Sequence, residues 1–175
     1  MQLEEAIVGR RSAREYLAQA IDDATIRRLI AAAVQAPSAV NEQPWAFAVA
    51  RERARLDRIS RRAKAHMLAT APAGARFESS RARLSDPGFD IFYGAPALIV
   101  VAATAPGPWI VEDCAMAAEN LMLTAFAEGL GSCWIGYAQS FLNTPEGKAE
   151  LGAPQAWVPV APIIVGRPRD RKSVV

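Results

Sequence analysis

The sequence predicts one α+β domain. Helical and strand-like segments follow one another as helices, strand, helix, strand, long helix, strand, helix, strand, without the regular alternation that builds a parallel sheet. The 175 residues are enough for one domain with a sizeable core. With 51% hydrophobic and 22% charged residues, the composition is that of a globular protein. We therefore expect residues 1–175 to form a single domain.

The first half supplies three helices and one strand. We predict a helix over 2–9, a second helix from Asp22 or Asp23 to about 34, a strand over 45–50 and a basic helix over 52–70. Gly9 ends the first helix, and an aspartate caps the second. The basic helix has an apolar stripe opposite its arginines, which favours a solvated charged face over a nucleic-acid surface.

The second half begins with a segment of mixed signals over 71–94, interpreted as a loop or lid around a short helix. We then predict a buried strand over 97–103, a long helix over 109–130, a strand over 132–135, a helix from Thr144 to about 151 and a strand over 157–165. The long helix is apolar on almost every face, so it is expected to be buried, with a subunit interface as one location. Pro159 and Pro162 require an edge position or a bulge for the last strand.

Charge and cysteine content limit the ligands and partners that the protein is expected to have. The formal net charge is +2, yet arginines cluster locally, which favours a small anionic ligand over nucleic acid. Cys114 and Cys133 are too few for a disulfide framework, and buried inert thiols are the favoured interpretation, although Cys133 could lie near a cofactor. No apolar run is long enough to span a bilayer, and the first residues lack a signal-peptide pattern. We expect a cytoplasmic protein without membrane or nucleic-acid partners.

Several catalytic chemistries lack their residues. The single histidine, His66, sits in the basic helix and is expected to be exposed there, so a catalytic triad is unsupported. The sequence contains neither a metal-ligand cluster nor a P-loop, and its glycines at 129, 131 and 136 follow a helix, unlike a dinucleotide fingerprint. An organic cofactor that performs the chemistry itself remains an attractive alternative.

Four motifs carry the candidate site. In Arg10-Arg11-Ser12-Ala13-Arg14, guanidinium groups and a hydroxyl suit phosphate oxygens, or form surface ion pairs with Glu4 or Glu5. The loop Ala36–Trp45 offers polar groups suited to a heterocycle edge, or is an ordinary connecting turn.

The other two motifs lie in the second half of the chain. In Gly129–Gly136, two glycines allow a planar ligand to approach the backbone, while Trp134 is by spacing a core residue. The segment Pro162–Lys172 is a strand with a basic tail that could close over a phosphate, or a solubilising C-terminus.

Together these motifs resemble the nitroreductase family of flavoproteins. The resemblance rests on Arg-Arg-Ser-x-Arg, Ala-Pro-Ser-x-x-Asn-x-Gln-Pro-Trp, Gly-Leu-Gly-Ser-Cys-Trp-Ile-Gly and Val-Gly-Arg-Pro, which occur in family order from Arg10 to Arg171. It implies an α+β fold with a central antiparallel sheet flanked by helices, and an obligate homodimer with two FMN molecules at the subunit interface.

The resemblance also assigns site residues. Arg10, Arg11 and Ser12 would hold the FMN phosphate and ribityl chain, and Arg14 would lie at the pyrimidine edge. Arg169 or Arg171 would complete the phosphate site. Trp134, Ile135 and Gly136 would pass the flavin, with a backbone N–H near N5. The partner subunit would contribute Pro37, Ser38, Ala39, Asn41 and Gln43.

The implied activity is ping-pong transfer of hydride from NADH or NADPH, through flavin N5, to a nitroaromatic, quinone or enone. No side chain need act as a general base, so no catalytic residue is assigned. Specialised flavin chemistry on the same fold, either reductive dehalogenation or flavin breakdown, remains an alternative, as does a flavin-binding or nucleic-acid-binding module without catalysis. The short 71–94 segment and the short tail after Gly166 leave the acceptor and the electron donor open.

Overall fold

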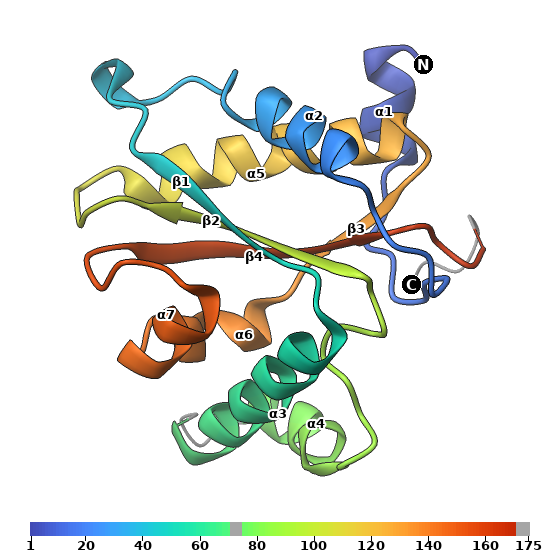
Figure 1. The fold of residues 1–175 in the computed structure, drawn as a ribbon, viewed down its shortest axis with the longest axis vertical. Helices are drawn as coiled ribbons and strands as arrows, with labels where there is room; N and C mark the ends of the chain where they lie inside the picture. The colour runs from blue at the N-terminus through green and yellow to red at the C-terminus, as the bar shows by residue number, and fades with distance from the viewer. Residues whose placement is uncertain (71–74, 171–175) are drawn as a thin grey trace.

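The computed structural model describes residues 1–70 and 75–170. Its centre is a four-stranded antiparallel sheet in the order β1–β2–β4–β3, with helices on both faces (Figure 1). The strands are β1 (Trp45–Ala50), β2 (Ala97–Ala103), β3 (Gly131–Trp134) and β4 (Val158–Gly166). The predicted α+β class with a helix-flanked antiparallel sheet is confirmed.

The helices also follow the prediction closely, with two additions, the short η1 and α6. They are α1 (Leu3–Gly9), α2 (Asp23–Ala33), the 3₁₀ helix η1 (Ala39–Asn41), α3 (Arg53–Thr70), α4 (Ala75–Ser85), α5 (Ile110–Ala127), α6 (Gly136–Leu142) and α7 (Pro145–Leu151). Asp22 caps α2 by accepting the Thr25 N–H at 2.7 Å. The sequence did not predict α6, a seven-residue helix that begins at a glycine directly after β3.

The protein has two apolar cores, one on each face of the sheet, because successive side chains of a strand point to opposite faces. On β2, Ile99 and Val101 belong to the core under α2 and α5, whereas Leu98 and Val100 belong to the core under α3 and α6. Figure 1 shows α2 and α5 on one face of the sheet and α3, α6 and α7 on the other. Both faces of the sheet are therefore buried, which explains the continuous apolar run of β2.

The prolines of β4 are accommodated by a bulge. The pairing of β2 with β4 shifts between Val101, which faces Ala161, and Ala102, which faces Pro159. The carbonyl of Pro162 accepts the Ile135 N–H at 2.7 Å, so this residue still contributes a hydrogen bond despite lacking an N–H. Of the two predicted solutions the bulge is the correct one, because β4 lies inside the sheet.

Within the single chain, α5 is buried on one side only, so the part of the expectation that concerns a subunit interface stays a prediction. Cys114, Ala117 and Leu121 are fully buried, but Val111 is 55% exposed and Met116 is 38% exposed. One side of α5 packs on the sheet and α2, while another side carries apolar groups to the surface. An apolar residue at such a position has no core to pack against within one chain.

Candidate functional site at the edge of the sheet

Three of the four sequence motifs meet at the β3 edge of the sheet. After α1 the chain runs beside β3, where Ser12 forms a parallel bridge with Ser132 and the Ala13 N–H donates to the Ser132 carbonyl at 3.0 Å. A few residues later Tyr16 bridges Pro168, just beyond the end of β4. The arginine motif, the glycine-rich turn and the start of the basic tail therefore lie side by side.

Alternate side chains of this N-terminal segment affect the buried thiol of Cys133. Burial raises the pKa of Cys133, while a hydrogen bond with Ser12 and the positive charges of Arg14 and Arg10 act on that pKa in the opposite direction. The pairing of this segment with β3 places all three predicted site residues along one edge of the sheet. Two guanidinium groups and a hydroxyl form a donor set suited to a phosphate.

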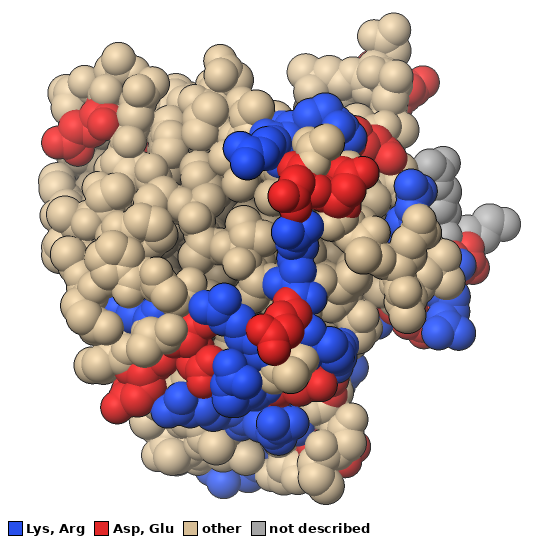
Figure 2. All heavy atoms as spheres, in the orientation of Figure 1, with Lys and Arg blue, Asp and Glu red and all other residues tan. Residues whose placement is uncertain are grey.

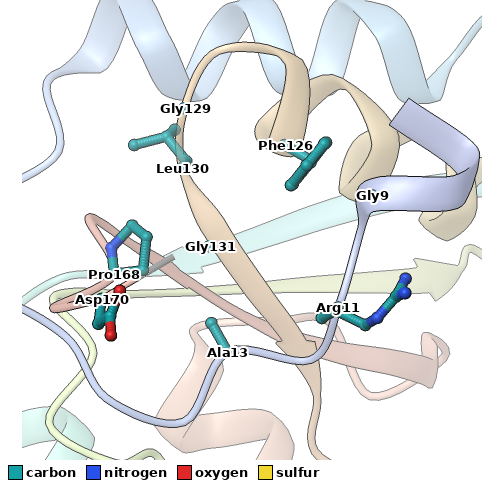
Figure 3. A pocket seen from close by; sticks show the side chains of 9 residues that line it. All are labelled: Gly9, Arg11, Ala13, Phe126, Gly129, Leu130, Gly131, Pro168 and Asp170. Atoms are coloured by element: carbon teal, nitrogen blue, oxygen red, sulfur yellow. The ribbon is translucent and has the colours of Figure 1, made fainter. Parts of the chain in front are cut away.

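Arg11 faces the other way. Its guanidinium donates to the carbonyls of Val8 and Arg10 at 2.5 and 2.9 Å. With Ala13 and Asp170 it lines a small pocket of about 30 Å³, shown in Figure 3. Such a volume holds a water molecule or two and excludes a flavin. The structure therefore does not place Arg11 with Arg10 as a phosphate ligand.

Gly131 has a different role from the one predicted. A Cβ at this position would lie 2.6 Å from the Cβ of Ala13, which is too close for any real side chain. The close backbone approach that the glycines permit is thus to the chain's own N-terminal segment, not to a planar ligand. Gly129, with a φ of 77°, terminates α5 in the left-handed conformation common after helices.

Open space lies beside Gly136 at the end of the same turn. A Cβ there would meet no atom within 4 Å. Trp134 packs half-buried against the core under α2 and α5, as its spacing predicted, and Ile135 is buried in the core on the other face. Of the three predicted residues of the turn, Gly136 leaves the most room for a ligand beside the backbone.

The fourth motif lies elsewhere in the chain. The loop Pro37–Gln43 includes η1 and precedes β1, and Figure 1 places it at the end of the molecule away from α1 and β3. The side chains of Asn41 and Gln43 are exposed. Both backbone groups of Ala39 are used within the chain, by Asp113 and Glu42. One chain therefore does not unite this loop with the arginine motif.

The basic tail reaches the site only in part. Arg169 donates its N–H to the Glu15 carbonyl at 3.0 Å and lines a cleft of about 920 Å³ together with Tyr16, Tyr93 and the start of α3. Arg171 lies outside the described residues. The cleft also contains Arg51 and Arg53, whose guanidinium groups already pair with aspartates.

The sequence did not predict the aromatic residues near these groups. Tyr93 has a φ of 52°, an uncommon conformation for a residue other than glycine. Burial raises its pKa, and the charges of Arg83 and Arg14 lower it. The hydroxyl of Tyr137, directly after Gly136, donates to the Ser80 hydroxyl of α4 at 3.0 Å. Two features of the sequence could have identified these residues: Tyr93 stands shortly before a buried strand, and Tyr137 directly follows the glycine-rich turn.

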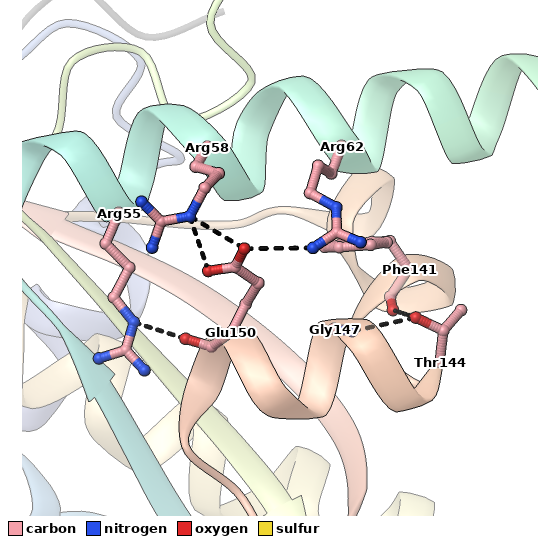
Figure 4. Close-up of polar contacts among 7 residues, drawn as sticks. All are labelled: Arg55, Arg58, Arg62, Phe141, Thr144, Gly147 and Glu150. Atoms are coloured by element: carbon pink, nitrogen blue, oxygen red, sulfur yellow. Dashed lines mark hydrogen bonds and ion pairs between the residues drawn. The ribbon is translucent and has the colours of Figure 1, made fainter.

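The arginines of α3 are tied to other elements. The Nε of Arg58 lies 2.9 and 3.1 Å from the two carboxylate oxygens of Glu150 on α7, and Arg62 joins the same carboxylate (Figure 4). Arg55 donates to the Glu150 carbonyl. Figure 2 shows positive and negative side chains interleaved over the part of the molecule where α3 lies. This agrees with the solvated charged face that we expected, since Arg58 and Arg62 remain 48% and 43% exposed while they pair with Glu150.

The described part of the chain contains neither a metal-ligand cluster nor a helix that could span a membrane. Within residues 1–70 and 75–170, no group of three His, Cys, Asp or Glu side chains could hold a metal ion. None of the helices described there is both long and apolar enough to cross a membrane. His66 is half-buried, with a ring nitrogen 3.0 Å from the Ser140 hydroxyl.

Comparison with known families gives one match over most of the chain. The model of the nitroreductase family matches residues 7–167. A protein of Archaeoglobus fulgidus, which carries the inferred name NADH dehydrogenase/NAD(P)H nitroreductase, is 31% identical over 167 residues, covering 95% of this chain and 86% of the relative. The 5,6-dimethylbenzimidazole synthase of Rhodospirillum rubrum is 30% identical over 178 residues, covering 94% of this chain and 81% of the synthase.

Solved structures agree with the sequence match. A nitroreductase of Bacteroides fragilis, crystallised with bound FMN, superimposes with a TM-score of 0.85. It is 26% identical in sequence, and the match covers 100% of this chain and 92% of the other. The arrangement of sheet, helices and edge segment described above is thus shared over the full length of the chain.

Proposed function

The chain belongs to the nitroreductase family, and from this premise we propose that it is an FMN-dependent oxidoreductase that passes electrons from NADH or NADPH to an electron-poor acceptor. The observation that carries the proposal is the pairing of the segment that holds Arg10, Ser12 and Arg14 with β3, next to the turn that ends at Gly136. Arg10 and Ser12 offer donors suited to a phosphate, Arg14 offers a cation suited to the pyrimidine edge of a flavin, and Gly136 leaves open space beside the backbone.

The residues present fit the cofactor. Arg10 and Ser12 would bind its phosphate and ribityl chain, and Arg14 would stabilise negative charge at the pyrimidine edge. The absence of a side chain at Gly136 leaves room for the ring. When bound, FMN would supply the redox chemistry by taking hydride at N5 and passing it to the acceptor. The chain contributes position and electrostatics, and no general base is needed.

We propose further that two copies of the chain complete the site. The loop Pro37–Gln43, whose Asn41 and Gln43 side chains are exposed, lies away from its own arginine motif. Large exposed apolar residues flank this arrangement on α1, η1 and α5: Leu3, Ile7, Val8, Val40, Trp109, Val111 and Met116. Burying them against a second copy would remove apolar surface from water and bring that copy's loop to the arginine motif.

The deciding experiment is an anaerobic absorbance spectrum of the FMN-loaded protein before and after addition of NADH or NADPH. We expect flavin bands that bleach on addition of one or both donors. If the flavin bands persist with both donors, the conclusion that the protein binds FMN would stand, but the proposed dependence on NADH or NADPH would be overturned. A protein that cannot be loaded with FMN would overturn the whole proposal.

Flavin breakdown is the second candidate, because the Rhodospirillum rubrum relative is a 5,6-dimethylbenzimidazole synthase. The two activities differ in what becomes of the flavin. After aerobic turnover with NADPH, mass spectrometry of the released small molecules would show intact FMN for an acceptor reductase. Loss of FMN with formation of 5,6-dimethylbenzimidazole would favour the second candidate instead.

A further inference from the structure

The loop Pro37–Gln43 is held in a conformation that its own residues disfavour. Val40, Asn41 and Gln43 have φ values of 45°, 58° and 50°, in the left-handed region. Asparagine tolerates that region, but it is uncommon for glutamine and a genuine outlier for a β-branched valine. The Val40 side chain is also 91% exposed, so it is not held by packing within the chain. Other contacts must therefore fix this backbone.

Two of those contacts lie at the C-terminal end of the loop. The Gln43 N–H donates to the Ser38 hydroxyl at 2.9 Å, which closes the loop on itself. The Thr104 N–H donates to the Pro44 carbonyl at 2.8 Å, which attaches the end of the loop to the sheet. Neither contact fixes the middle of the loop to the body of the protein.

The middle of the loop is anchored by Asp113 in the first turn of α5. One carboxylate oxygen, Oδ1, accepts the Ala39 N–H at 2.9 Å. This side chain comes from a segment 74 residues further along the chain, so it ties the loop to the longest helix of the α2–α5 face.

Asp113 is a costly residue to bury. It is 1% exposed, no ion pair joins it to a described Lys or Arg, and its Oδ2 has no hydrogen-bond partner among the described residues. A buried carboxylate is normally paired with a cation or fully hydrogen-bonded. The positive end of α5 offsets part of this cost. A neutral side chain would fill the same space with a smaller desolvation cost, which indicates that Asp113 has a role beyond packing.

We propose that Asp113 is a positioning residue for the flavin site. It holds the strained loop, through the Ala39 N–H, in the conformation that presents the Asn41 and Gln43 amides outward to a second copy's flavin. The inference rests on the proposed function for its ligand, but the anchoring itself is a property of the chain alone. The two parts can therefore be tested separately.

The structure offers a substitution that removes the donor without bending the backbone. Ala39 is the first residue of η1, a position that tolerates proline. The preceding Ser38 has φ −137° and ψ 154°, the extended conformation that a following proline requires. Ala39→Pro thus deletes the N–H that Asp113 accepts, and the pair Ala39→Pro and Asp113→Ala forms a double-mutant cycle.

The first measurement is FMN affinity, by quenching of flavin fluorescence on titration of the apoprotein. We expect Asp113→Ala and Ala39→Pro each to weaken binding about tenfold, and the double variant to be no weaker than either. Asp113→Asn retains an acceptor oxygen and is expected within about twofold of the parent. Thr144→Ala removes the cap of α7, far from the loop, and serves as a control destabilised without loss of affinity.

The second measurement needs no flavin. Hydrogen exchange of the apoprotein, followed by mass spectrometry of the peptide containing residues 37–45, should be at least tenfold faster in Asp113→Ala and close to the parent in Asp113→Asn. Unchanged exchange in Asp113→Ala, or additive losses of affinity in the double variant, would overturn the inference. A parent that fails to bind FMN would overturn the proposed function, while the exchange data would still decide whether Asp113 anchors the loop.

Discussion

Arg10 and Arg11 are adjacent in sequence but have different surroundings. Arg10 lies near Cys133 and 3.4 Å from Glu119, whereas Arg11 turns back to the carbonyl of Val8. We expect Arg10→Ala to weaken FMN binding by roughly 1.5–3 kcal/mol, the range for a charge-assisted hydrogen bond. Arg11→Ala should have a clearly smaller effect. Fluorescence titration of both variants checks this, and equal losses would contradict the separation of the two side chains.

The conformation of the segment explains why the motif alone could not distinguish these arginines. In an extended segment alternate side chains share a side, so Arg10, Ser12 and Arg14 belong together and Arg11 does not. The sequence shows three arginines and a serine, but not that the segment pairs with β3. The resemblance grouped Arg10, Arg11 and Ser12, whereas the separation of Arg11 from its neighbours became visible only through the bridge between Ser12 and Ser132.

Gly131 offers a second test at a single residue. Gly131→Ala would force its methyl against Ala13, so the N-terminal segment must move away from β3. We expect a loss of stability of roughly 1–3 kcal/mol, typical of overpacking, together with weaker FMN binding. Thermal unfolding of the apoprotein measures the first effect. In the same assay Gly136→Ala, whose methyl meets nothing within 4 Å, should leave the midpoint unchanged.

Among the elements, α3 and α7 depend on one carboxylate. The hydrogen bond from Arg58 is the main cause that lowers the pKa of Glu150, with a further contribution from Arg62. A lowered pKa means that the ionised form is favoured in the folded state. Its stabilising contribution is present above the ordinary pKa of about 4.5 and is lost as the pH falls through the lowered pKa.

We therefore expect Glu150→Gln to lower the free energy of unfolding at pH 7 by roughly 1 kcal/mol, since one end of the network is partly exposed. Urea unfolding of both proteins should converge as the pH is lowered from 7 to below 4. A difference that stays constant over this range would show that the charge of Glu150 contributes nothing. Arg61→Ala, an exposed arginine on the same helix, controls for removal of a cation from α3.

The positions of helices and strands along the chain were easier to predict than the contacts between segments that are distant in the sequence. The runs 45–50 and 97–103 are continuous, apolar and bounded by turn residues, so their strand boundaries agree with the structure. Helix α6 was missed because seven residues beginning at a glycine carry little periodicity. The anchoring of the Pro37–Gln43 loop by Asp113 could not be predicted, because it depends on contact between segments that only the packing of α5 brings together.

At the scale of the whole molecule, the exposed apolar residues and the divided site point to the same assembly. Ile7 on α1 and Val111 on α5 are 57% and 55% exposed. We expect the double variant Ile7→Asp and Val111→Asp to sediment as a monomer and to lose FMN, because a charge at either position opposes burial. Sedimentation velocity detected at flavin wavelengths measures both properties at once. A monomer that retains stoichiometric flavin would refute a site shared between two chains.

The pairing of the N-terminal segment with β3 has a further consequence, for solubility. A four-residue strand at the border of a sheet exposes hydrogen-bonding groups that can recruit strands from other molecules and begin aggregation. Here Ser12 and Ala13 occupy that border, so the same residues that line the candidate site also cap the sheet. Shortening the chain past Tyr16 should therefore cause precipitation whether or not the protein binds FMN, so loss of flavin in such a variant would not by itself locate the binding residues.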